Sequence, residues 1–290
     1  KDSAYGYMDA VEKYIVSSEL EDESIPDGTY SVEELNSMGV SVKGSTPDNG
    51  TIKIESKTVK SYDIGIDGYA VSNGEVEKVS TTTQFKNGKI VYYNPVSREK
   101  CNDYTEANSK TGTNSGCMKW YVFNDKEGNA TVNVILDHNI TAGVAYNSTG
   151  SNSEMKEVKK ALENDTKDWK KTARLITANE VAKITENTGF DASTENQDWF
   201  YLDSNNQTQI ASSTNKSKYA WLFDYTNECT NYGCNKPDSS NWGYWTSTSY
   251  KGNSTYAWHV YRVGSLYNYY VFDNAIGVRP VITISKFNIS

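Results

Sequence analysis

An abrupt change in composition near residue 86 divides the 290-residue chain into two unequal parts. Residues 1–86 contain 8 Lys, no Arg and 16 acidic residues, whereas residues 87–290 contain 21 basic and 21 acidic residues. The net charge of −8 therefore belongs entirely to the first part. All seven Trp and all four Cys lie in the second part. Because charge, rings and thiols change together, we expect one domain at residues 1–86 and another at residues 87–290.

The overall composition excludes several classes of protein. Aromatic residues make up 12% of the chain, which is too many for a disordered tail. The acidic net charge argues against a nucleic-acid partner, because phosphate binding requires clustered Lys and Arg. No apolar run approaches the roughly 18 residues that a membrane helix needs. His138 and His259 are the only two histidines, so three-histidine metal chemistry is excluded.

The first part begins with an amphipathic pattern. Ala4, Met8, Val11 and Ile15 recur with a helical period, which predicts an N-terminal helix. Since no capping residue comes before Lys1, we expect this helix to continue from a preceding segment. The residues that follow predict a short helix at 32–37, strands at 51–55, 61–66 and 69–71, and a hairpin turn at Asp67-Gly68.

Three sequence runs of the first part carry a family resemblance. They are Ser3-Ala4-Tyr5-Gly6-Tyr7, Ile25-Pro26-Asp27-Gly28-Thr29-Tyr30 and Gly39-Val40-Ser41-Val42-Lys43-Gly44. Together they resemble the headgroup of a clostridial-type type IV pilin, over about residues 1–80. The resemblance implies other pilin subunits as partners through the N-terminal helix. It also implies a membrane contact only through a hydrophobic stem that precedes this segment. The alternative is an ordinary α+β module.

The second part combines few helical patterns with many short strand-like runs. Helices are expected at 154–169 and 177–186, where Thr177 and Glu180 form a capping box. Pro280 places the last strand at an edge or a bulge. This pattern predicts an α+β fold. The expected strands are 119–123, 131–136, 143–146, 244–248, 256–263, 266–272 and 278–285.

Four runs of the second part carry another resemblance. They are Ala173-Arg174-Leu175-Ile176-Thr177-Ala178-Asn179-Glu180, Tyr244-Trp245-Thr246-Ser247-Thr248, Ala257-Trp258-His259-Val260 and Gly277-Val278-Arg279-Pro280-Val281-Ile282. Their order is similar to that of the C-type-lectin-like fold in its bacterial branch. That branch includes formylglycine-generating-enzyme-like domains and the variable proteins of diversity-generating retroelements. The resemblance implies a C-type-lectin-like domain with two helices and short antiparallel strands over about residues 87–290.

Residues 250–276 are rich in Tyr, Asn and Ser, a composition typical of recognition surfaces. Tyr offers a large rigid face, and Asn and Ser adapt their hydrogen bonds. In retroelement-diversified proteins this interval carries the variable ligand-contacting residues. Strand alternation predicts Trp258 and Val260 inward and His259 and Tyr261 outward, so about half of the set is expected to be exposed. The expected ligand-binding residues are Tyr250, Asn253, Tyr256, His259, Tyr261, Tyr267, Asn268, Tyr269, Tyr270, Asp273 and Asn274.

The four cysteines form two closely spaced pairs. An even count in an exported chain favours two local disulfides, Cys101–Cys117 and Cys229–Cys234. A four-Cys zinc site is one alternative, although the spacing of the first pair does not match a zinc knuckle. A formylglycine-generating-type copper oxidase would use Cys229 and Cys234. In those enzymes the pair lies close to the terminal Gly-Phe-Arg segment, whereas here it lies far upstream of Gly277.

These patterns predict a binding protein and no enzyme. We expect a minor or tip type IV pilin that acts as an adhesin in an extracellular pilus at the cell surface. Its receptor would be a protein or a glycan. No catalytic residues, cofactor or metal are expected, and Trp245-Thr246-Ser247 supplies no carboxylate for a lectin-type calcium site. The alternatives are the copper oxidase and a secreted structural module.

Overall fold

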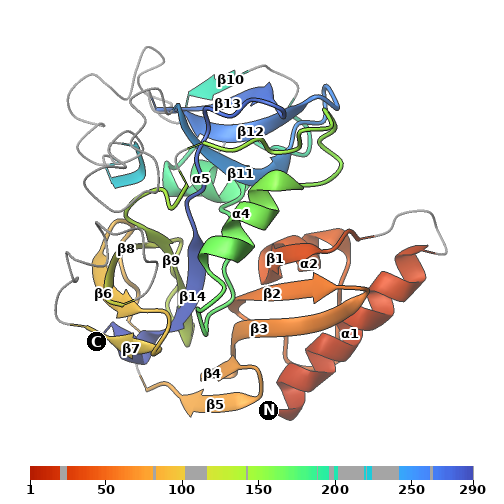
Figure 1. Cartoon of the computed structure of the whole chain (residues 1–290). Coiled ribbons are helices and arrows are strands. Elements are labelled where there is room, and N and C mark those ends of the chain that lie inside the picture. The colour runs from red at the N-terminus through yellow and green to blue at the C-terminus, as the bar shows by residue number, and fades with distance from the viewer. Residues whose placement is uncertain are drawn as a thin grey trace.

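Three antiparallel sheets dominate the computed structural model of the chain (Figure 1). The strand orders are β1-β2-β3-β4-β5 in the first sheet, β10-β13-β12-β11 in the second and β14-β9-β8-β6-β7 in the third. The first sheet belongs to residues 1–86, and the other two belong to residues 87–290. The structure describes residues 1–19, 25–80, 83–101, 116–141, 143–187, 189–195, 199–201, 219, 221–223, 242–261 and 264–289.

The first part is a helix packed on a sheet. Its N-terminal helix α1 (Asp2–Glu19) buries the apolar face that the sequence predicts. A capping box of Ser31 and Glu34 starts the second helix. The turn Asp67-Gly68 has positive φ at both residues, as a tight hairpin requires. The remaining elements are β1 (Gly28–Ser31), α2 (Val32–Met38), β2 (Asn49–Glu55), β3 (Thr58–Ile66), β4 (Tyr69–Ser72) and β5 (Glu75–Lys78).

The second part contains the two other sheets and, among the described residues, the short helices α4 (Glu157–Asp165) and α5 (Ala178–Ile184). The capping box predicted at Thr177 and Glu180 is present at the start of α5. The third sheet is built from β6 (Ile90–Asn94), β7 (Glu99–Lys100), β8 (Met118–Phe123), β9 (Thr131–Leu136) and β14 (Val281–Ser285). The other elements are β10 (Trp199–Tyr201), β11 (Gly243–Ser249), β12 (Tyr256–Tyr261), β13 (Ser265–Tyr270) and the 3-10 helix η3 (Lys286–Asn288).

The predicted α+β class is wrong, because the described residues are dominated by sheets. Helices α4 and α5 of the second part are only 9 and 7 residues long. The helix expected at 154–169 ends at Asp165, and Lys170 N then donates to Pro95 O in a connecting segment. The helix expected at 177–186 ends before Glu186, which has φ 59°. The aromatic and β-branched runs favour strand pairing over longer helices.

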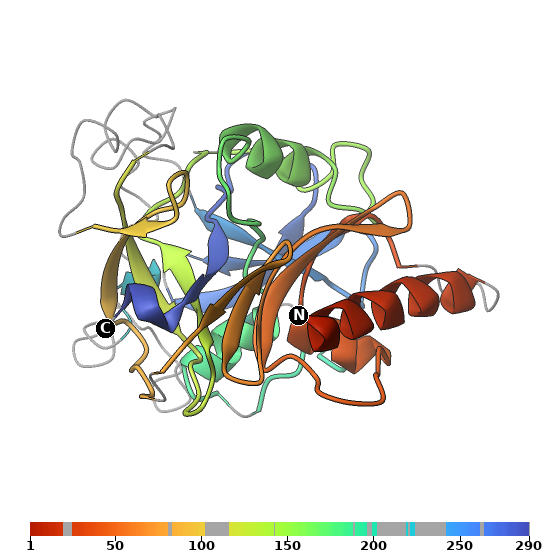
Figure 2. The same ribbon diagram turned by 90° about the horizontal axis from the view of Figure 1, so that it is seen from below.

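The first sheet lies between α1 and the second part (Figure 2). Side chains alternate along a strand, so each strand presents different residues to the two sides. Ile52, Ile64 and Ile66 belong to the apolar cluster that α1 covers. Asp63 and Gly65 alternate with them on β3 and contact the second part. The sheet therefore has an apolar face toward its own helix and a polar face toward residues 87–290.

Each part has its own apolar clusters. The buried members of one cluster all lie between Ala4 and Val71. The buried members of the other two all lie between Val91 and Ile289. That each part folds independently stays a prediction.

Hydrogen bonds and ion pairs join the two parts. Asp63 is 2% exposed and accepts from Lys171 Nζ and from Thr172 N, both at 2.8 Å. The hydroxyl oxygens of Thr51 and Thr283 lie 2.9 Å apart. A buried carboxylate is costly unless it is paired and hydrogen-bonded, so this site specifies how the two parts dock.

We expect Asp63→Asn to lower the free energy of unfolding by about 3 kcal/mol, because it leaves the buried ammonium of Lys171 unpaired. The asparagine oxygen can still accept from Thr172 N. The loss of unfolding free energy therefore measures the contribution of the Asp63 charge to the ion pair with Lys171. Chemical denaturation at neutral pH gives the value. The matched control is Glu127→Gln on the surface, which should change stability by less than about 0.5 kcal/mol. Equal effects of the two changes would show that the pair does not stabilise the docked arrangement.

Candidate functional site

The interval predicted to bind a ligand forms the two central strands of the second sheet. β12 and β13 pair antiparallel, with Tyr256 opposite Tyr270 and His259 opposite Tyr267. Trp258 and Val260 point to one face, where they join a buried apolar cluster. The other face carries His259 and the tyrosines that flank it.

His259 is buried, contrary to the prediction that it points outward into solvent. It does lie on the opposite face from Trp258, but rings cover that face too. Its ring centroid lies 5.9 Å from those of Trp245 and Tyr267 and 5.7 Å from that of Tyr261. Burial lowers the pKa of His259 to about 3, so the imidazole is neutral at physiological pH.

The rings around His259 form a cluster in which Trp245 is buried and the remaining rings are partly accessible. Tyr261, Tyr267 and Tyr269 are half-buried. Trp242 contacts Tyr269 at 5.2 Å and Tyr261 at 6.4 Å between ring centroids. Burial, together with the charge of Asp273, raises the pKa of Tyr269, so this phenol stays neutral and can donate a hydrogen bond. The ring cluster is Trp242, Trp245, His259, Tyr261, Tyr267 and Tyr269.

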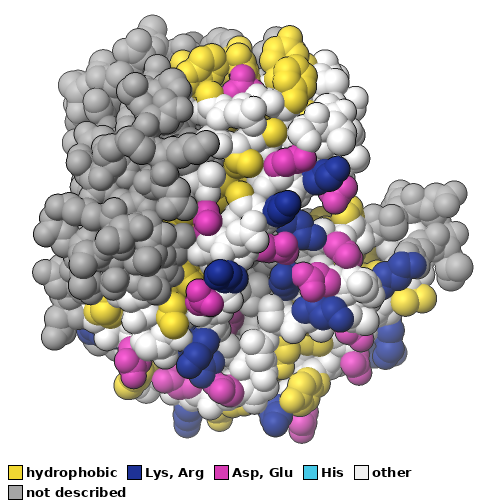
Figure 3. All heavy atoms as spheres, in the orientation of Figure 1, with side chains coloured by type: hydrophobic (Ala, Val, Ile, Leu, Met, Phe, Trp, Pro, Cys, Tyr) yellow, Lys and Arg dark blue, Asp and Glu magenta, His cyan; other side chains and the backbone are white. Residues whose placement is uncertain are grey.

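A second set of rings, Tyr256, Tyr270 and Phe272, forms a row. The Tyr256 and Tyr270 centroids are 4.6 Å apart, and Tyr270 and Phe272 stack at 5.1 Å. Tyr270 is 41% exposed and Phe272 is 51% exposed. Figure 3 shows hydrophobic side chains gathered on the molecular surface above β12 and β13. This ring row is the exposed aromatic part of the predicted interval.

The structure divides the predicted ligand-binding residues into three groups by exposure. Tyr250 and Asn268 are buried like His259, and Tyr250 packs against Trp258 at 5.3 Å between centroids. Asn253 and Asp273 shape local turns, since their side chains accept from Thr255 N and Ala275 N. The exposed members are Asn253, Tyr270 and Asn274, and the half-buried members are Tyr256, Tyr261, Tyr267, Tyr269 and Asp273.

Two ring residues of this surface are missing from the predicted set. Trp242 precedes β11, and Phe272 follows β13. The sequence placed Phe272 in a strand, where an apolar ring is expected to be buried in the core. Its position in a turn just after the strand exposes it instead. For Trp242 the sequence offers no distinguishing signal.

The Gly277-Val278-Arg279-Pro280 run has a structural role. The buried guanidinium of Arg279 donates from Nε to Leu136 O at 2.6 Å and from its terminal nitrogens to the carbonyls of Trp221 and Leu222 at 2.7 and 2.9 Å. It also lies 5.1 Å from the ring of Tyr244. Arg279 therefore holds β9, residues 221–222 and β11 together.

A second buried pair positions α5 against β11. Arg174 donates to both carboxylate oxygens of Glu180 at 2.6 and 2.7 Å. The same carboxylate accepts from Thr177 N at 2.9 Å. Ala178 N then donates to Thr248 Oγ1 of β11 at 2.9 Å. These contacts fix the sheet that carries the rings.

The other groups considered from the sequence are placed as follows. Cys101 and Cys117 form a disulfide, whereas Cys229 and Cys234 lie outside the described residues. Asp137 accepts from Tyr121 Oη at 2.6 Å, and burial beside Arg279 lowers the pKa of His138 to about 3. Within the described part of the chain, no three His, Cys, Asp or Glu side chains gather where they could hold a metal ion.

Comparison with known proteins identifies no relative. No family model matches the chain, and neither the curated proteins nor the solved structures contain a significant match. Among the described helices, none has the length and apolar character needed to cross a membrane. The resemblances to type IV pilins and to C-type-lectin-like proteins stay predictions.

We expect Trp258→Ala to lower the free energy of unfolding by about 3–5 kcal/mol, since it removes a fully buried ring from the core. Tyr270→Ala at the exposed end of the same sheet should cost no more than about 1 kcal/mol. Chemical denaturation of both variants provides the comparison. If Tyr270→Ala unfolded the protein, the ring row would be part of the core.

Acid should destabilise the protein through His259. Its folded pKa of about 3 lies below the value of about 6.5 for an unfolded chain, so the unfolded state binds the proton first. Stability is then lost as the pH falls below about 6.5, by roughly 2 kcal/mol for this group on reaching pH 5. Denaturation across this range should show a smaller loss for His259→Phe. An unchanged pH dependence in that variant would contradict the assignment.

Proposed function

We propose that this chain is an adhesin-type binding protein that contacts its receptor through the ring row of Tyr256, Tyr270 and Phe272. The observation that carries the proposal is the contact of these three rings in one row, in which Tyr270 and Phe272 are exposed to solvent. Exposed Asn253 and Asn274 belong to the same interval and supply adaptable hydrogen-bonding groups.

The geometry favours recognition because the rings are rigidly mounted. Tyr256 and Tyr270 are directly paired residues of neighbouring strands, so the backbone ladder sets their spacing. Binding therefore orders few rotamers, and each buried ring contributes a large apolar area. Interfaces concentrate their energy in such central aromatic anchors.

The neighbouring ring cluster supports a binding role over proton-transfer chemistry. His259 sits within it, but burial keeps the imidazole neutral and away from solvent. Tyr269 is partly accessible, and its ring centroid lies 5.6 Å from that of Tyr270, so it offers a hydroxyl group beside the ring row. A receptor that covers the row can use this hydroxyl as a hydrogen-bond partner.

We propose further that α1 joins the adhesin to a pilus at the cell surface through other pilin subunits. The resemblance of residues 1–80 to type IV pilins motivates this role. One side of α1 packs on the first sheet, and its outer side carries exposed Tyr5 and Val16. These side chains offer apolar contacts for neighbouring subunits.

We expect Tyr270→Ala and Phe272→Ala each to weaken attachment of the purified protein to cultured animal cells or to a glycan array by at least about tenfold, which corresponds to loss of a central aromatic anchor. Tyr69→Ala removes an exposed ring from β4 of the first sheet and is the matched control. Normal attachment of both ring-row variants, or an equal loss in Tyr69→Ala, would refute the proposal.

A further inference from the structure

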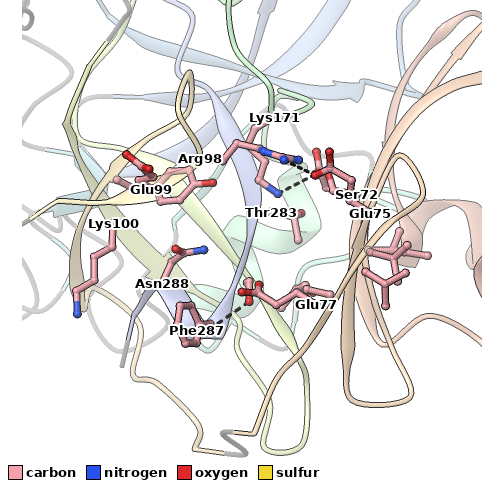
Figure 4. Close-up of a pocket in the computed structure, with 18 residues that line it drawn as sticks. Ser72, Glu75, Glu77, Arg98, Glu99, Lys100, Lys171, Thr283, Phe287 and Asn288 are labelled. Carbon is pink, nitrogen blue, oxygen red and sulfur yellow. Dashed lines mark hydrogen bonds and ion pairs between the residues drawn. The ribbon is translucent and has the colours of Figure 1, made fainter. Parts of the chain in front are cut away.

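A cleft of about 630 Å³ lies between the two parts of the chain and is built from different elements than the ring row (Figure 4). One wall comes from β3, β4 and β5 of the first sheet. The other comes from β6, β7, β9, β14 and η3 of the second part. Its volume falls within the range of about 300–1,000 Å³ that is typical of small-molecule sites.

Two buried hydroxyls line the cleft. Tyr93 and Thr131 are 0% and 3% exposed, and within the described residues neither Tyr93 Oη nor Thr131 Oγ1 has a hydrogen-bond partner. Burial raises the pKa of Tyr93, so its phenol keeps its proton as a donor. Because buried polar groups normally have partners, these two hydroxyls favour an occupant that is itself rich in hydroxyl groups.

Some charged side chains at the cleft form ion pairs, whereas one carboxylate does not. Lys171 is neutralised by Asp63 at 2.8 Å, and Arg98 is neutralised by Glu75. Glu77 is exposed and forms no ion pair within the described part of the chain, and Figure 4 shows it extending from β5 across the cleft toward Phe287. An occupant with a positive charge would pair with this carboxylate.

The mouth of the cleft also offers an apolar surface. Phe287 on η3 is 64% exposed, and Asn288 beside it carries a side-chain amide. Aromatic rings pack against the apolar face of a ligand, and amides bond its polar edge. The cleft thus combines hydroxyls, a carboxylate, an amide and a ring in one volume.

We propose that this cleft binds an amino sugar with a free primary amine. The ammonium group pairs with Glu77, the sugar hydroxyls bond Tyr93 and Thr131, and the C–H face of the ring packs on Phe287. A neutral sugar would leave the carboxylate unpaired, and a simple diamine would leave the two buried hydroxyls without partners. The proposal is independent of the receptor surface, since the two sites share no residues.

The test is a titration of the whole protein with glucosamine, followed by NMR at mildly acidic pH, where the amine is protonated. Glucose, N-acetylglucosamine and 1,5-diaminopentane are the comparison probes. We expect saturable glucosamine binding in the millimolar range and at least about tenfold weaker binding of each comparison probe, because each lacks one of the two interactions. No saturable binding of glucosamine, or equal binding of glucose or the diamine, would overturn the proposal.

Two variants assign the contacts. Glu77→Gln should weaken glucosamine about tenfold and leave glucose unchanged, whereas Tyr93→Phe should weaken both sugars about fivefold. Tyr93→Phe removes an unpaired buried hydroxyl and should not lower the melting temperature, so its effect reports on the ligand. Glu127→Gln, on the exposed surface of the second part, is the matched control and should bind as the unmodified protein does. Unchanged affinity in both cleft variants would place the sugar elsewhere.

Discussion

The buried guanidinium of Arg279 is the contact on which the architecture of the second part depends. It donates to backbone carbonyls at the end of β9 and at Trp221 and Leu222, and it lies against the ring of Tyr244 on β11. These acceptors come from segments far apart in the chain. A buried charge requires several such partners, so removing one of them leaves a costly unsatisfied group. The second and third sheets are thereby held in one arrangement, which sets the direction in which the rings of β12 and β13 face.

The sequence predicted those elements whose formation depends on nearby residues or on a single packing partner. The helical spacing of Ala4, Val11 and Ile15 requires only a sheet to pack on, and α1 forms as predicted. The capping box of Thr177 and Glu180 is local and is present. The predicted α+β class failed because the helices end after two or three turns, where connecting segments bond to distant backbone such as Pro95. Such partners leave no local pattern.

Exposure within the candidate site was the least predictable property. Alternation correctly separates Trp258 from His259, but it cannot say that Trp245 and three tyrosines cover the second face as well. The opposite error was made at Phe272. It was expected to be buried in a strand, but it lies in the turn after β13 and is exposed. The cleft was beyond prediction, since Glu77, Tyr93 and Thr131 meet only after the two parts dock.

The two proposed sites depend on different contacts. The cleft depends on the docking of the two parts through polar groups, whereas the ring row depends on contacts within the second part. Asp63 and Thr51 lie on the face of the first sheet that meets the second part, and their partners Lys171 and Thr283 also line the cleft. A change that separates the two parts would therefore dismantle the cleft. The ring row is built from β12, β13 and the turn that follows β13, and it depends on Arg279 and Arg174 instead. Loss of docking should thus abolish amino-sugar binding while leaving the receptor surface intact, and this difference makes the cleft a reporter of how the two parts are arranged.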